Sequence, residues 1–308
     1  MSSKAQSFNT RQHMVRKTYE VFRYRDAYLN EVALHHHDFY EIYLFLSGNV
    51  NYAIESRTYR LSPGDILLIS PDELHQPMFG RERQAYERIV IWIDKTYLQQ
   101  FSALSLSLDR CFDTGQSGHT NLIRPDSTTR QHLIQLLEKV LLERDSAEFG
   151  SQMYADTCLI QALLLINRLA QRHSGSPEMP DKSSSVVGSI LAYINEHYAE
   201  DLSLDLLANK FFISKYHLSR EFNRLVGTSV HRYIIQKRLV IAKQLMSDGV
   251  PSTTVYQHCG FGDYSNFYRA FKAEYQITPK EYIASLKADA QRTRGRAIER
   301  GWLMQDAK

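Results

Sequence analysis

The sequence has few cysteines and no segment suited to a membrane. Its three cysteines, Cys111, Cys158 and Cys259, stand far apart and are odd in number, which argues against a disulfide framework and against a cysteine metal site. No apolar run approaches the roughly 20 residues needed to cross a bilayer, and residues 1–17 lack the apolar core of a signal peptide. These absences predict a cytoplasmic protein with no membrane partner.

The composition is that of an ordinary globular protein on a long chain. The 308 residues are 43% apolar and 23% charged, which suits two domains that each bury a core. Residues 186–308 carry 17 Lys plus Arg against 12 Asp plus Glu, whereas the preceding residues carry 20 against 22. This surplus favours a polyanionic partner for the C-terminal part, although similar surpluses are common on proteins that bind no nucleic acid.

The pattern of apolar residues changes along the chain. Short apolar runs alternate with turn residues between about residues 19 and 93, which predicts a β-sandwich or barrel. Residues 129–144 and 151–171 instead show helical periodicity, and the second helix is so apolar that a homodimer interface is one explanation. The sequence therefore predicts an α+β protein with a β-rich domain at 1–172, a Ser-rich linker at 173–185 and an all-α domain at 186–308.

The helical part contains an internal repeat. Residues of the same kind recur at a step of 49, and each copy has a natural N-cap residue, Ser214 or Asp263, before its second helix. The matched pairs are Leu218 and Phe267, Arg220 and Arg269, Phe222 and Phe271, Ser229 and Thr278, and Tyr233 and Tyr282.

Each copy is predicted to form a helix, a tight turn and a second helix. The first copy places helices at 204–210 and 215–225, and the second places them at 253–259 and 264–275 with a turn one residue longer. A helix at 230–246 joins the copies. Two helix-turn-helix units on one rigid connector would reach successive major grooves of DNA, because each groove admits one helix.

The second helix of each copy supplies the predicted contacts with DNA. Arginine reads guanine and asparagine reads adenine through paired hydrogen bonds, whereas other cations neutralise phosphates. An alternative for Arg220 and Arg269 is that they cap or bridge helices. The predicted base-facing residues are Lys215, Tyr216, His217, Ser219, Arg220, Tyr264, Ser265, Asn266, Tyr268 and Arg269, and the predicted phosphate contacts are Arg224, Lys237, Arg238 and Lys272.

Several short motifs mark the two copies. They are Leu207-Ala208, the run from Tyr216 to Phe222, Gly227-Thr228-Ser229, Gly260-Phe261-Gly262-Asp263, Phe267, Arg269, Phe271-Lys272 and the Thr278-Pro279 pair before Tyr282. Through these motifs residues 186–285 resemble the DNA-binding domain of the AraC/XylS family of bacterial transcriptional regulators. The chain departs from the pattern at Gln276, where the family usually has Gly, and at Tyr256, where it usually has a small residue.

This resemblance implies a protein that binds promoter DNA and activates transcription through contact with RNA polymerase. The Arg-rich tail after Lys287 extends beyond the family's usual end, and the sequence predicts no role for it.

The β-rich part contains His35, His37 and Glu41 before Gly48, and then Pro63-Gly64-Asp65 leading to His75. Through these residues the segment 19–93 resembles the two motifs of the cupin barrel, with Asp72 where cupins often have a turn glycine. On a strand, His35, His37 and Glu41 would share a face and His36 would point outward to solvent. Three imidazoles and a carboxylate suit Fe, Mn, Ni or Zn; the alternative is that His35, His37, Glu41 and His75 line a ligand pocket or hydrogen-bond within the barrel.

Two functions follow from these patterns. The first is a regulator that is not an enzyme, in which a small molecule, such as a sugar or derivative, enters a cupin-like barrel and changes how the double helix-turn-helix binds DNA. The second is a metal-dependent cupin enzyme whose helical half serves assembly. The repeated helix-turn-helix favours the regulator.

Overall fold

The chain forms two compact units, residues Met1–Ser189 and Ile190–Lys308. The computed structural model describes residues 13–27, 29, 32–80, 85–102, 107–116, 118–144, 146–173 and 186–288. The predicted linker, apart from His173, and the tail beyond residue 288 lie outside the described residues. The first unit is rich in strands and the second is helical, so the predicted α+β fold with two domains is confirmed.

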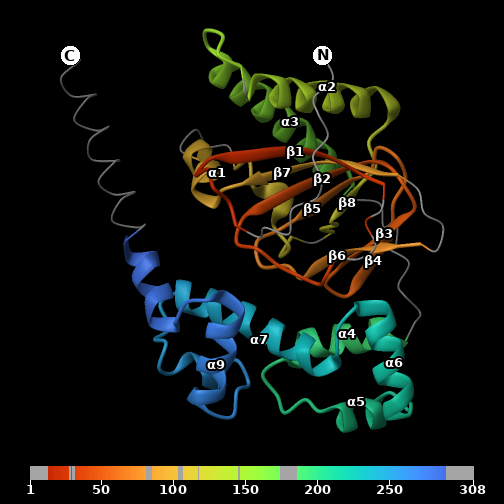
Figure 1. The fold of residues 1–308 in the computed structure, drawn as a ribbon, viewed down its shortest axis with the longest axis vertical. Coiled ribbons are helices and arrows are strands. Elements are labelled where there is room, and N and C mark those ends of the chain that lie inside the picture. The colour runs from red at the N-terminus through yellow and green to blue at the C-terminus, as the bar shows by residue number, and fades with distance from the viewer. Residues whose placement is uncertain are drawn as a thin grey trace. The chain divides into compact units, whose positions relative to one another are not determined.

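Two antiparallel sheets build the first unit (Figure 1). In spatial order, the five-stranded sheet contains β1 (Tyr19–Asp26), β7 (Tyr86–Ile93), β2 (Tyr40–Ser47), β5 (Ile66–Ile69) and β8 (Leu122–Ile123). The three-stranded sheet contains β4 (Arg57–Arg60), β3 (Val50–Ile54) and β6 (His75–Phe79). In the described part of the chain the two sheets remain separate, and β8 pairs with the edge of β5, so of the predicted sandwich or barrel the chain forms the sandwich. The result is a two-sheet sandwich.

Both faces of the five-stranded sheet are buried. Along β2, Ile42 and Leu44 pack toward the helices, whereas Tyr43 and Phe45 pack between the two sheets, as alternation along a strand requires. Figure 1 shows α2 (Ser127–Glu143) and α3 (Ser151–His173) covering the outer face of this sheet. Burial of each such side chain contributes roughly 1.5–3 kcal/mol. Most of the apolar surface of α3 is therefore covered within one chain.

Two short elements lie between β7 and β8 in the sequence. They are α1 (Lys95–Ser102) and the 3₁₀ turn η1 (Arg110–Phe112). The three cysteines are free and buried, as expected of packing residues. No helix among the described residues is both long enough and apolar enough to cross a membrane.

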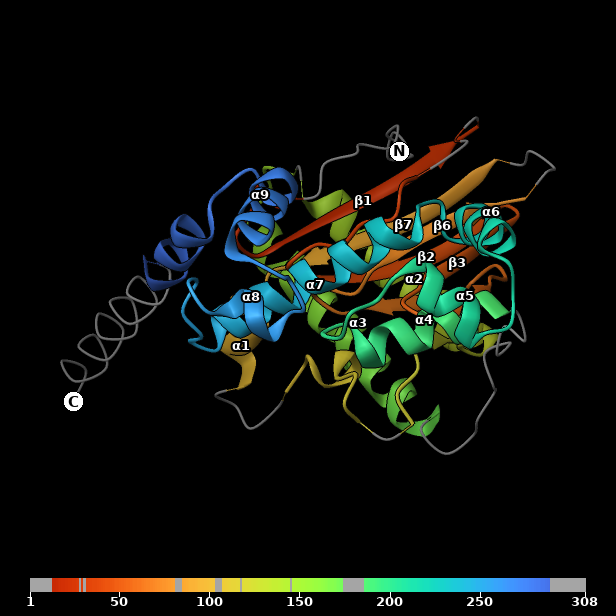
Figure 2. The same cartoon turned by 90° about the horizontal axis from the view of Figure 1, so that it is seen from below.

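The second unit contains the two predicted helix-turn-helix copies (Figure 2). After α4 (Val186–His197), the first copy is α5 (Leu204–Lys210) and α6 (Lys215–Val226), and the second is α8 (Val255–His258) and α9 (Tyr264–Tyr275). The connecting helix is α7 (Val230–Ser247). Four residues separate α5 from α6 and five separate α8 from α9, so the predicted longer second turn is confirmed.

Candidate DNA-binding helices and sensor site

The first turn of α6 is fixed at its N-terminus and exposed on one face. The hydroxyl of Ser214 accepts a hydrogen bond from the backbone N–H of His217 at 3.2 Å, which confirms the predicted N-cap. Leu218 and Phe222 are fully buried, whereas Tyr216 is 75% exposed. The other predicted base-facing residues of this helix, Lys215, His217, Ser219 and Arg220, are also exposed.

The first turn of α9 is built in the same way but carries a hydrogen-bonded chain of polar side chains. Asp263 accepts from the backbone N–H of Asn266 at 2.7 Å and from its side-chain amide at 2.6 Å. The amide oxygen of Asn266 in turn accepts from the guanidinium of Arg269 at 2.6 Å. Tyr264, Ser265, Asn266 and Arg269 are exposed, and Tyr268 is half-buried. Asn266 and Arg269 are thus held side by side by hydrogen bonds within α9 and its N-cap.

The four predicted phosphate contacts have different surroundings. Arg224 forms an ion pair with Glu221 at 2.7 Å, Lys272 is exposed and Lys237 is half-buried. Arg238 donates to the carbonyl oxygens of Tyr198 and Glu200 at 2.8 and 2.7 Å, and burial lowers the pKa of its guanidinium. Arg238 therefore links the segment before α5 to α7 by hydrogen bonds, a role that the sequence does not predict. Its contact with phosphate stays a prediction.

A groove between α7 and α9 is lined by two basic residues that the sequence analysis missed. His231 and Arg232 line it together with Arg238, Asn266 and Arg269. Arg232 also forms an ion pair with Glu274. No spacing rule distinguishes these two residues from other basic positions of a helix, so the sequence gives no signal for them.

In the first unit, backbone pairing brings two of the predicted histidines together. His35 and His75 form an antiparallel bridge, with N–H to carbonyl distances of 3.2 and 2.9 Å. Residues 36–39 lie outside the strands, and β2 begins at Tyr40, so His35, His37 and Glu41 do not lie on one strand as predicted. The prediction that His36 is exposed is wrong for the same reason: His36 is only 7% exposed, with Nδ1 3.8 Å from a carboxylate oxygen of Asp72.

Asp72 stands where the cupin motif often has a turn glycine. Its φ of 69° lies in the left-handed region, which Asp tolerates better than most residues. The position therefore keeps the backbone conformation of the motif without its glycine.

Backbone carbonyls fix the orientation of the three histidine rings. Nδ1 of His35, His37 and His75 lies 2.9, 2.9 and 2.8 Å from the carbonyl oxygens of Ala33, Phe39 and Glu73, in that order. A carbonyl only accepts, so each Nδ1 carries the hydrogen and each Nε2 faces away from the backbone. Burial, followed by the neighbouring histidines, holds the pKa of His75 well below its usual range.

Glu41 completes a compact group of possible ligands. One carboxylate oxygen, Oε2, accepts from the indole N–H of Trp92 at 2.8 Å and lies 3.1 Å from Nε2 of His37. Nε2 of His75 is buried and has no hydrogen-bond partner among the described residues. The ligand atoms of His37, Glu41 and His75 all lie within 4.8 Å of one another; the fourth predicted residue, His35, is not in this group.

These three residues fit a metal ion after a small inward shift. Ligands at about 2.0–2.2 Å on opposite sides of an ion are at most about 4.4 Å apart. Metal-bound histidines usually donate their second nitrogen to a carbonyl or carboxylate, as the histidines do here. His37, Glu41 and His75 would hold such an ion, which would supply charge and a Lewis acid to the sandwich interior.

Aromatic and charged side chains surround this group between the sheets. The ring of Tyr52 is stacked at 6.3 Å from that of His75. The guanidinium of Arg88 lies 4.1 Å from the ring centroid of Tyr86 and forms an ion pair with Asp26. A buried interior of this kind offers both hydrogen bonds and flat apolar surfaces.

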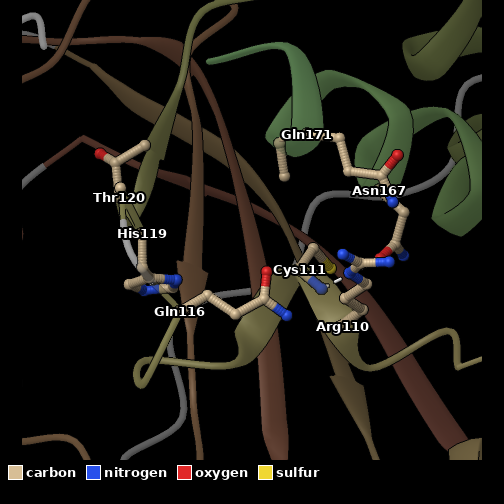
Figure 3. A pocket seen from close by; sticks show the side chains of 9 residues that line it. Arg110, Cys111, Gln116, His119, Thr120, Asn167 and Gln171 are labelled. Carbon is tan, nitrogen blue, oxygen red and sulfur yellow. Dashed lines mark hydrogen bonds between the residues drawn. The ribbon is translucent and has the colours of Figure 1, made fainter. Parts of the chain in front are cut away.

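A separate small pocket lies between the 110–120 segment and the C-terminal part of α3 (Figure 3). Asn167 and Gln171 face it from α3, and Arg110, Cys111, Gln116 and His119 line the other side. The Asn167 amide donates to the carbonyls of Leu108 and Leu163 and accepts from the N–H of Cys111, each at 2.9 Å. The sequence analysis does not predict this pocket.

Two regions of the chain match known families of domains. Residues 19–163 match the AraC-like ligand binding domain, and residues 207–285 match a helix-turn-helix domain. The chain belongs to the AraC/XylS family. It is a ligand-responsive, DNA-binding transcriptional regulator with an N-terminal sensor domain, and its partners include promoter DNA.

Two curated relatives align with most of this chain. The HTH-type transcriptional activator RhaS of Escherichia coli O157:H7 is 24% identical over 248 residues, covering 80% of this chain and 86% of the relative. RhaS of Enterobacter sp. strain 638 is 25% identical over the same coverage. Among solved structures, ToxT of Vibrio cholerae O395 bound to (E)-4-(8-methylnaphthalen-1-yl)but-3-enoic acid is 13% identical, covers 88% of this chain and 100% of that chain, and gives a TM-score of 0.38.

Proposed function

We propose that this regulator reads promoter DNA sequence through α6 and α9, each in its own major groove. The observation that carries the proposal is the pairing of two capped, exposed helix N-termini on one buried connector. Leu239, Ala242 and Met246 of α7 are buried, so the connector is anchored in the core of the second copy. A rigid connector fixes the separation of the two helices and therefore the spacing of the half-elements that they read.

Selection of bound duplexes from random DNA tests this proposal. We expect enrichment of a site with two half-elements about one helical turn apart. The binding should retain its sequence preference at two salt concentrations while the overall affinity falls. Salt-sensitive retention without any enriched sequence, from protein that is natively folded, would overturn the proposal.

We propose that the effector is a small polar compound, such as a sugar or derivative, bound in the sandwich interior beside His37, Glu41 and His75. Support comes from buried charges, Glu41 and Arg88, next to aromatic rings, which suits a hydroxylated ligand. The pocket at Asn167 is less suited because the amide of Asn167 is already satisfied by backbone groups. A panel of sugars scored by thermal shift tests the effector class, and no shift with any member would contradict it.

A divalent transition metal ion is the second proposed ligand of the same interior. The observation that favours it is the buried Nε2 of His75, which faces Glu41 and His37 without a hydrogen-bond partner among the described residues. An unpaired buried acceptor costs about 1–3 kcal/mol, and coordination would remove this cost. The distance of 3.1 Å between Nε2 of His37 and Oε2 of Glu41 also fits a cation shared by the two side chains.

Metal-free protein is expected to bind one Zn²⁺ per chain, and His75→Ala and Glu41→Gln are each expected to weaken this binding at least tenfold because each removes one of three ligands. Isothermal titration with Zn²⁺ measures the stoichiometry and affinity. His36→Gln is the matched control, since His36 adjoins His37 but approaches Asp72 instead. Equal Zn²⁺ binding by all four proteins would contradict the site.

We propose that any bound metal acts in sensing rather than in catalysis. The relatives are transcriptional activators, which supports a regulator over a metal-dependent cupin enzyme with a helical assembly domain. Turnover of candidate substrates by Zn²⁺-loaded or Fe²⁺-loaded protein would favour the enzyme instead.

We further propose that the protein contacts RNA polymerase and forms a homodimer. Support for a dimer comes from apolar side chains left exposed around the α2–α3 connection: Leu142, Phe149, Met153 and Tyr154. Sedimentation equilibrium tests the dimer, and a monomer at micromolar concentration would contradict it. Transcription with purified polymerase from a promoter carrying the selected site tests activation, and an unchanged initiation rate would contradict it.

A further inference from the structure

The turn between α5 and α6 carries an exposed phenylalanine in a left-handed backbone conformation. Phe212 has a φ of 54° and is 95% exposed. In the second copy, the residue that follows the helix cap in the same way is Gly260, with a φ of 76°. A partly or fully buried apolar residue follows in both copies, Ile213 and Phe261. The first copy therefore has a bulky side chain where the second has a glycine.

The left-handed conformation of Phe212 raises the free energy of the folded protein. A left-handed conformation is a genuine outlier for a bulky residue, because its Cβ crowds the backbone. The exposed ring is not among the residues that form the buried cores of the described chain, so burial does not offset this cost. Such an outlier points to a contact made outside the free protein.

We propose that Phe212 is a further DNA-contact residue, whose ring packs on an apolar surface of the duplex beside the groove that α6 enters. The inference rests on the proposed role of α6. Phe212 lies two residues before the N-cap Ser214, at the end of α6 that presents Lys215 and the exposed ring of Tyr216. Lys215 forms an ion pair with Asp205 of α5, and this end of α6 is continuous with the proposed base-reading face.

The apolar surfaces that duplex DNA offers at a groove edge are the thymine methyl group and the deoxyribose ring. Contact between Phe and a thymine methyl is an established form of readout in the major groove. Either surface would bury an otherwise exposed ring, which gives a favourable hydrophobic term on binding only. Contact of Phe212 with either surface would raise the affinity for DNA. Contact with a thymine methyl group would also create a preference for thymine at that position.

A substitution that relieves the backbone separates this role from a structural one. Phe212→Gly is expected to raise the thermal unfolding midpoint, or leave it unchanged, while weakening binding to the selected site roughly five- to tenfold. Gln276→Gly is the matched control, because Gln276 also has a left-handed φ, 60°, but stands at the C-terminal cap of α9. This control should raise the midpoint without changing the affinity for DNA.

Deoxyuridine in place of each thymine of the half-element read by α6 distinguishes the two apolar surfaces. If deoxyuridine weakens binding by the wild type but not by Phe212→Gly, the ring contacts a thymine methyl group. If Phe212→Gly binds more weakly than wild type by the same factor on both DNAs, the ring contacts deoxyribose. If Phe212→Gly binds DNA with wild-type affinity, the inference is overturned. If that variant also activates the promoter less than wild type, the ring of Phe212 contacts RNA polymerase instead of DNA. If Tyr216→Ala and Arg220→Ala also bind as wild type, the proposed role of α6 fails with it.

Discussion

Replacement of Gly260 by alanine is expected to lower the free energy of unfolding of the helical unit by about 3 kcal/mol. Gly260 has a φ of 76°, and a Cβ built there would lie 2.8 Å from the carbonyl oxygens of both Tyr198 and Ala199. These are backbone atoms of the segment that Arg238 fastens to α7, so neither moves aside cheaply. The alanine would therefore combine the cost of a left-handed residue with a backbone clash.

Urea unfolding followed by the helical circular dichroism signal measures this change. Gly249→Ala is the matched control, because Gly249 also has a left-handed φ, 98°, but no atom lies within 4 Å of the added Cβ. The control should lose only about 1–2 kcal/mol, the cost of the left-handed conformation. Equal losses in the two variants would show that the packing around Gly260 relaxes, and would contradict the argument from the clash.

The helix-turn-helix copies show which features can be predicted from sequence. The bounds predicted for α5 and α9 coincide with those observed, because N-cap residues and the repeated apolar positions are local signals that the tertiary structure keeps. The conformation of Phe212 leaves no such signal, since a propensity rule would place glycine or asparagine there. The same holds for Arg238, whose partners are carbonyl oxygens that lie 38–40 residues away in the chain.

The sequence predicts three of the side chains that gather in the first unit, but it predicts His35 with them and does not predict their geometry. The motif spacing identifies His37, Glu41 and His75, which the structure brings together. The alternation expected of a strand fails at residues 36–39, where the chain turns away from regular pairing, and His36 is buried as a result. The ring orientations depend on the carbonyls of Ala33, Phe39 and Glu73, which only the folded backbone places.

Arg220→Ala and Arg269→Ala are each expected to weaken binding to the selected DNA site by roughly 10- to 100-fold, about 1–3 kcal/mol. Both arginines are exposed on the second turns of their helices, and loss of a bidentate contact with guanine also relaxes the preference at that base pair. Fluorescence anisotropy with the selected duplex and with single-base variants measures both effects. Affinities equal to wild type, in folded variants, would contradict base reading by these residues.

Substitutions beside the two base-reading arginines are expected to change DNA binding in different ways. The guanidinium of Arg269 is already oriented by the amide oxygen of Asn266. Asn266→Ala should therefore weaken DNA binding, because it removes both the base contact of Asn266 and this orientation of Arg269.

Arg224→Ala is the matched control for Arg220→Ala on α6, because Arg224 is exposed but is predicted to contact only phosphate. It should weaken binding to all sequences alike and reduce the salt dependence by about one phosphate contact, whereas Arg220→Ala should change the sequence preference. A change of preference in Arg224→Ala, with none in Arg220→Ala, would reverse the roles assigned to these two arginines.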